Sequence, residues 1–219
     1  LKRLKCGQYE SPDNTCTMDL KPGAYEHVHA EFKVLPIVSD KVKQLITVIT
    51  SYEFHGTGIM SFQIVDWEKV QQRWKIMPYK QSTSDSDIKI IFEPGFMAKK
   101  IIDKRTVTIR DYMIAGTTFT LQLSADFTKP CRNCIAYLTN LILKTQSVVP
   151  VNEGYPDFEV VEDTLRCKEL PIKVPTDYKL TTSFTNVEMK EPIVNGMIVA
   201  RYDYTITRLL TKKIEIVRR

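Results

Sequence analysis

Alternation of apolar and polar residues recurs along most of the chain and constrains its fold more than any other feature. Met60, Phe62 and Ile64 are each separated by one polar residue, and the same period of two returns at residues 118–124 and 198–206. Such alternation is typical of antiparallel strands with one face in a core and the other in water. The sequence therefore predicts an all-β fold, namely an antiparallel β-sandwich.

Two denser apolar runs and a series of turn signals complete the strand pattern. The runs, residues 45–50 and 88–92, indicate strands that are covered on both faces. The turn signals are residues 55–58, 81–87, Pro94-Gly95, Ala115-Gly116, 152–156 and Asn195-Gly196. The last suits a tight hairpin because both residues tolerate positive φ.

The chain has 219 residues, enough for one β domain to bury its own core. It shows no internal repeat and no long linker, so we expect a single domain over residues 1–219. It begins at Leu1 rather than Met, so we expect a processed form or a fragment.

One segment departs from the period of two. Its apolar residues have the i, i+3, i+4, i+7 spacing of one helical face and predict a short helix near residues 131–144. They are Cys131, Cys134, Ile135, Leu138, Leu141 and Ile142.

The five cysteines are all candidates for disulfides. Cys6 and Cys16 would close a small loop, whereas Cys131, Cys134 and Cys167 bracket the predicted helix. An odd number leaves at least one thiol free or paired with another chain. The grouping favours an oxidising compartment, and hence a secreted or lumenal location.

The pair Cys131 and Cys134 also permits a redox interpretation. A helix N-terminus would lower the pKa of a thiol placed there, as in thiol-disulfide oxidoreductases. The strand-rich sequence around the pair lacks the βαβ alternation of such enzymes, so a structural role is favoured and redox catalysis remains an alternative.

Other chemistry is not indicated by the sequence. It contains no phosphate-binding glycine motif and no recognisable nucleophile motif, and its three histidines do not make a metal site. We therefore predict no catalytic residue, no metal and no cofactor. Aromatic and basic residues do not interleave in a nucleic-acid recognition motif. The net charge of +5 permits attraction to an anionic membrane surface, although solvated termini explain it more simply.

The segment from Cys131 onward resembles the ganglioside-activator proteins and the wider class of ML-like lipid-recognition sandwiches. The residues that carry the resemblance are 134–143, Cys167, Pro171-Ile172-Lys173, Tyr178-Lys179-Leu180, Phe184, Glu191-Pro192, and residues 198–206 led by Gly196. The resemblance implies a cup-like sandwich with an apolar cavity, and a disulfide between Cys167 and either Cys131 or Cys134. It also implies non-enzymatic binding of a lipid or another hydrophobic small molecule for transfer or presentation.

In that interpretation the cavity is lined by residues that face inward. They are Phe62, Ile64, Trp74, Phe119, Leu121, Leu123, Leu138, Ile142 and Tyr202. The alternative is a β-sandwich without an internal pocket that works through contacts with a protein partner or through self-assembly.

Overall fold

Strands dominate the structure and confirm the predicted all-β class. The computed structural model describes residues 3–6, 8–11, 15–18, 28–32, 41–71, 76–84, 86–102, 105–151 and 157–217. Within these ranges one short helix, α1 (Trp67–Gln71), accompanies the strands.

The chain divides into two compact units, whereas the sequence predicted a single domain. The first unit comprises Leu1–Ile46 and Thr211–Arg219, and the second comprises Thr47–Leu210. Two long strands, β4 (Lys41–Val65) and β17 (Ile193–Val217), contribute residues to both units.

The first unit contains a small antiparallel sheet. Its central strand β1 (Arg3–Cys6) pairs with β2 (Tyr9–Glu10) and with β3 (Val28–Glu31). A disulfide joins Cys6 to Cys16, which confirms the predicted small loop.

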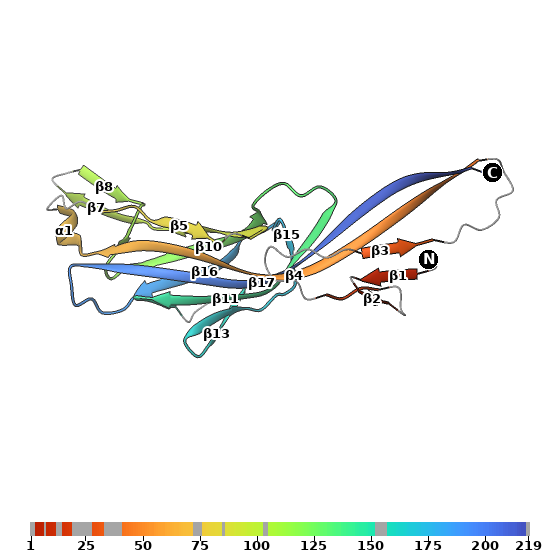
Figure 1. Cartoon of the computed structure of the whole chain (residues 1–219). Coiled ribbons are helices and arrows are strands. Elements are labelled where there is room, and N and C mark those ends of the chain that lie inside the picture. Colours follow the sequence, from red (N-terminus) through yellow and green to blue (C-terminus); the bar gives the residue numbers. More distant parts are fainter. Residues whose placement is uncertain are drawn as a thin grey trace. The chain divides into compact units, whose positions relative to one another are not determined.

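The second unit is built on two sheets (Figure 1). The smaller has the order β12-β16-β10-β6, and the larger has the order β13-β14-β11-β17-β4-β5, with β15 paired to β11 and β9 paired to β4. The strands of the smaller sheet are β12 (Val148–Pro150), β16 (Leu180–Asn186), β10 (Thr118–Phe127) and β6 (Ile88–Gly95). The further strands of the larger sheet are β13 (Phe158–Val161), β14 (Thr164–Cys167), β11 (Cys134–Gln146), β5 (Lys80–Thr83), β15 (Ile172–Val174) and β9 (Met113–Ile114). A separate hairpin is formed by β7 (Ala98–Ile102) and β8 (Arg105–Ile109).

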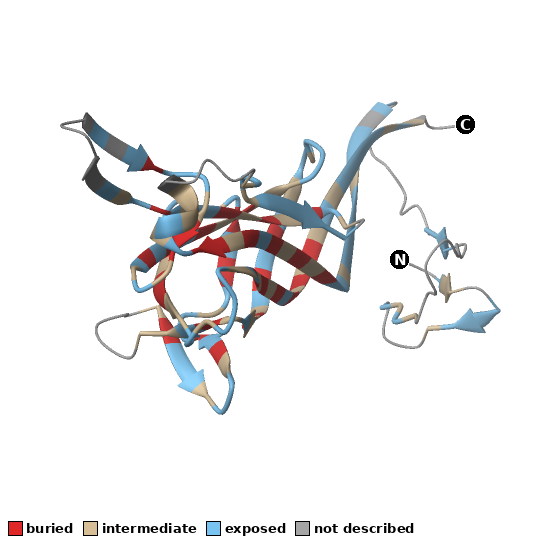
Figure 2. Ribbon diagram, turned by 90° about the vertical axis from the view of Figure 1, so that its left-hand side faces the viewer, coloured by how far each residue is buried: buried red, intermediate tan, exposed pale blue. Residues whose placement is uncertain are grey.

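The core lies between these two sheets, which makes the arrangement sandwich-like. Buried and exposed residues alternate along β10 and β17. Figure 2 shows bands of buried and exposed residues alternating along strands of the structure. Rings from opposite sheets meet in the middle, because Phe62 on β4 and Phe119 on β10 have centroids 5.6 Å apart.

The helix predicted near residues 131–144 is absent, because this segment is a turn followed by strand β11. Ala136 and Leu138 are buried, and after them Leu141 and Leu143. The register of β11 against β17 shifts between Leu138 and Asn140, which inserts one extra residue as a β-bulge. The bulge turns one spacing of two into a spacing of three, and the sequence pattern therefore imitated helical periodicity.

Two of the predicted turns were wrong as well, whereas the turn at Ala115-Gly116 is confirmed. Residues 55–58 lie inside β4, and Asn195-Gly196 lies inside β17. Each strand contains a glycine that faces a ring of the neighbouring strand. An ideal Cβ on Gly56 would lie 2.3 Å from the ring of Tyr202, and one on Gly196 would lie 2.6 Å from the ring of Phe62.

The two dense apolar runs are not covered on both faces. In residues 88–92 only the residues of one face, Ile88, Ile90 and Phe92, are fully buried. In residues 45–50 the side chains of Leu45 and Ile49 are 66% and 65% exposed. Residues 45–50 therefore carry apolar side chains that the described part of the chain leaves exposed to solvent.

Candidate functional site

Most of the residues predicted to line a cavity lie inside the sandwich. Those that are buried on inward faces are Phe62, Ile64, Phe119, Leu121, Leu123, Leu138 and Tyr202. Ile142 is not among them. It is half-buried between the inward-facing Leu141 and Leu143, because the bulge reverses which residues of β11 face inward. Trp74 lies outside the described residues.

The buried aromatic residues pack against one another. The ring centroid of Phe119 is 4.6 Å from that of Phe96 and 5.6 Å from those of Phe62 and Phe184. Such distances are typical of stacked and edge-to-face pairs in a close-packed core. This part of the interior is filled by its own side chains.

Two tyrosines close one end of the interior with polar contacts. The Tyr202 hydroxyl donates a hydrogen bond to the Ile88 carbonyl at 2.7 Å, and the Asp87 amide donates to the Tyr204 hydroxyl at 3.2 Å. Burial raises the pKa of both phenols above its usual value. These bonds tie β17 of the larger sheet to β6 of the smaller sheet and to the residue that precedes it.

One polar group inside the sandwich has no hydrogen-bond partner in the described structure. Thr182 on β16 is fully buried, and its Oγ1 atom is unsatisfied. It lies opposite the buried Leu121, between the buried Leu180 and Phe184, so its side chain belongs to the inward face. The neighbouring Ser183 instead lies 3.1 Å, Oγ to Oγ1, from Thr120.

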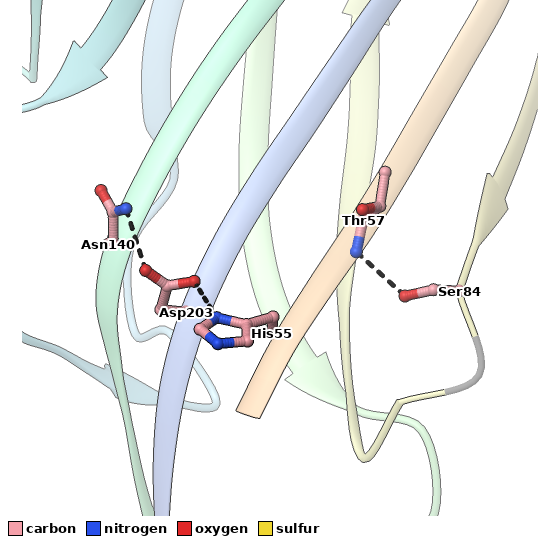
Figure 3. A network of polar contacts seen from close by, with 5 residues as sticks. All are labelled: His55, Thr57, Ser84, Asn140 and Asp203. Atoms are coloured by element: carbon pink, nitrogen blue, oxygen red, sulfur yellow. Dashed lines mark hydrogen bonds and ion pairs between the residues drawn. The ribbon is translucent and has the colours of Figure 1, made fainter. Parts of the chain in front are cut away.

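A polar network crosses three strands on the larger sheet (Figure 3). His55 Nδ1 on β4 lies 2.6 Å from Asp203 Oδ1 on β17, and Asn140 Nδ2 on β11 donates to Asp203 Oδ2 at 3.0 Å. The imidazole is 87% exposed. Partial burial raises the pKa of Asp203, but the hydrogen bonds from His55 and Asn140 outweigh it and hold that pKa below its usual value.

This lowered pKa gives a testable pH dependence. The network stabilises the fold above the unfolded-state pKa of Asp203, about 3.9, and its contribution is lost as the pH falls through the lower folded-state value. We expect Asp203→Asn to destabilise the protein at neutral pH by less than about 1 kcal/mol, since the carboxylate is partly exposed. Urea unfolding should show this difference shrinking as the pH falls below about 3.9. Asp177→Asn, at an exposed carboxylate, is the matched control, and an equal effect of both variants would contradict the assignment.

The remaining cysteines do not pair as the resemblance implied. Cys131 bonds to Cys134, and Cys167 is a buried free thiol whose pKa is raised by burial. The predicted disulfide from Cys167 to Cys131 or Cys134 is therefore wrong. The Cys131–Cys134 pair lies at the turn that starts β11, where the Leu209 amide donates to the Asn133 carbonyl. The helix N-terminus on which the redox interpretation depended is not there.

The described residues lack two further features. They contain no group of three or more His, Cys, Asp or Glu side chains that could hold a metal ion. They also contain no helix long and apolar enough to cross a membrane.

Fold and cysteine pairing define the class of this protein, which is an all-β, sandwich-like protein with two disulfides. Comparisons with models of protein families, with curated proteins and with solved structures found nothing that matches the chain.

Proposed function

We propose that this chain is a non-enzymatic β-sandwich that works by assembling with further copies of itself. The observation that supports the proposal is a group of exposed apolar side chains on the neighbouring strands β4 and β17, which we term the apolar group. Its members point to the same face of the sheet, and their exposed fractions are Val48 at 49%, Phe54 at 44% and Leu210 at 63%.

A single exposed apolar residue is ordinary on a protein surface, but a group of them on adjacent strands favours an interaction site. Removing apolar surface from water contributes about 25 cal/mol per Å². The sequence around Ile49 is also as dense in apolar residues as a strand covered on both faces. A second protein surface would provide the cover that the described structure lacks.

A secreted or lumenal location is part of the proposal. Disulfides persist in oxidising compartments and are rare in the cytosol. The pairs Cys6–Cys16 and Cys131–Cys134 support such a location.

Sedimentation velocity over a range of protein concentrations tests self-assembly. We expect the wild-type chain to associate, and Val48→Ser to weaken association about tenfold or more, equivalent to about 1.4 kcal/mol. Val160→Ser is the matched control, because Val160 is 49% exposed but lies on β13. A wild-type chain that stays monomeric at every concentration would refute the proposal, as would equal weakening by both variants.

Binding of a hydrophobic ligand between the sheets is a second candidate, supported by Thr182. A buried hydroxyl without a partner is costly, and the polar group of a ligand held between the sheets would satisfy it. The resemblance to ML-like lipid-recognition sandwiches agrees with this candidate, whose ligand would be a lipid or another hydrophobic small molecule.

Native mass spectrometry after incubation with mixed lipids tests the second candidate. Defined adducts that leave on denaturation, and that are weaker with Thr182→Val, would support it. An unchanged apo mass for both proteins would rule it out. The oligomer distribution in the same spectra bears separately on self-assembly.

A further inference from the structure

The Cys131–Cys134 disulfide lies at an accessible place in the second unit. Both cysteines are half-buried, and the pair spans the turn that leads into β11. Cys134 is the first residue of that strand and packs against the core, whereas Cys131 precedes the turn. A thiol from outside the chain can therefore reach the pair, and it does so most directly from the side of Cys131.

The turn is held in place without this disulfide. The Leu209 amide donates to the Asn133 carbonyl at 3.1 Å, and Cys134 pairs with Arg208 where β11 meets β17. The two cysteines are only three positions apart in the sequence. A disulfide that closes so short a loop restricts the unfolded chain little and therefore stabilises the fold little. A purely structural role explains this bond poorly.

The surroundings of the disulfide are positively charged. Lys129 and Arg132 flank Cys131, and residues 127–152 contain no aspartate or glutamate. On the neighbouring strand Arg208 is exposed and lies opposite the second cysteine in the register. The three basic side chains form no ion pair with a described residue. Positive charge of this kind stabilises a thiolate, and hence the sulfur that leaves when a disulfide is attacked. It takes the part that the absent helix N-terminus would have played.

We propose that the Cys131–Cys134 disulfide exchanges with external thiols, with Cys131 as the attacked sulfur and Cys134 as the leaving one. An external thiolate attacks Cys131 Sγ, the bond between the two cysteines breaks, and Cys134 leaves as a thiolate that takes a proton from water. A second external thiolate then attacks the external sulfur of the mixed disulfide and releases Cys131. Two external thiols become one disulfide, and the protein pair gains two electrons and two protons. The exchange is stoichiometric and independent of the self-assembly proposed above.

The same charges select among thiols. A positively charged site attracts a thiol with net negative charge and repels one with net positive charge. The ligand class is therefore the acidic thiols, for which glutathione is the probe. Cysteamine, which carries an ammonium group and no carboxylate, is the matched contrast.

Peptide mapping after a short reaction with glutathione tests the two sulfur roles. Free thiols are blocked with N-ethylmaleimide at a series of times, and the cysteine peptides are identified by mass spectrometry. We expect glutathione on Cys131 and maleimide on Cys134. This disulfide should open about tenfold faster than the Cys6–Cys16 disulfide, because a neighbouring arginine of the latter, Arg3, is paired with an acid. Equal rates, or glutathione on Cys134, would overturn the proposal.

The rate of the Cys6–Cys16 disulfide also serves as the reference for the choice of thiol. The ratio of the two opening rates should be higher with glutathione than with cysteamine. An equal ratio with both reagents would contradict the preference for acidic thiols.

A charge variant tests how the leaving sulfur is stabilised. Arg208→Gln should slow opening by dithiothreitol about threefold, the effect of one exposed unit charge a few ångströms away. Dithiothreitol is uncharged, so the change reports on the leaving thiolate and not on attraction of the reagent. Arg201→Gln, at another exposed arginine of β17, is the matched control and should leave the rate unchanged. An unchanged rate for Arg208→Gln, or equal slowing by both variants, would refute the part assigned to this charge.

Discussion

Replacing Phe119 with alanine is expected to lower the free energy of unfolding by about 3–5 kcal/mol. The ring is 2% exposed and contacts Phe62 of the opposite sheet as well as Phe96 and Phe184. Truncation removes buried apolar surface and leaves a cavity that the surrounding strands fill only in part. Urea unfolding at neutral pH, monitored by circular dichroism, measures the change.

Tyr178→Ala is the matched control, because this aromatic side chain is 47% exposed in the same unit, and we expect a change within about 0.5 kcal/mol. The Phe119 result also separates the two candidate functions. A ring that lines a ligand cavity has fewer partner atoms, so its removal should cost less than the lower end of the range. A loss near the upper end would favour a filled core and argue against a ligand cavity at this position.

The fold class could be predicted from the sequence because strand alternation is local. Phe119, Leu121 and Leu123 alternate with polar neighbours, and the structure buries all three. The same holds for Met60, Phe62 and the inward face of β17. In these segments the nearest neighbours along the chain already determine which residues face a core.

The wrong predictions share a different origin, since they depend on what lies across the sheet. The extra residue between Leu138 and Asn140 is visible only as a shift of β11 against β17. Gly56 and Gly196 have the composition of turns, yet each accommodates a ring from the neighbouring strand. A sequence without its pairing partners does not distinguish a turn glycine from one that lies beside an aromatic ring.

The candidate site was only partly predictable for the same reason. Residues 45–50 were predicted to be covered on both faces, but their exposure depends on which other strands pack on the faces of β4. The His55, Asp203 and Asn140 network was missed, because its members lie on three strands that are far apart in the sequence. Polar residues at alternate positions of β4 and β17 were the available signal, and using it required knowing that these strands are neighbours.

Gly56→Ala is expected to destabilise the protein by about 1–3 kcal/mol, near the upper end of that range. An ideal Cβ would lie 2.3 Å from two ring carbons of Tyr202 and 2.5 Å from its hydroxyl oxygen. The ring has little freedom to move, because it is 1% exposed and its hydroxyl donates a hydrogen bond to the Ile88 carbonyl. Either β4 shifts away from the ring, or the link from Tyr202 to β6 lengthens. Both changes should lower the midpoint of urea unfolding.

A double-mutant cycle with Tyr202→Leu identifies the cause. Leucine removes most of the ring atoms that an alanine at position 56 would meet, so Gly56→Ala should cost at least about 1 kcal/mol less in that background. The double variant should then lose less free energy of unfolding than the two single variants lose in sum. Equal losses in both backgrounds would mean that the alanine perturbs β4 alone, and that Gly56 is not needed to accommodate Tyr202.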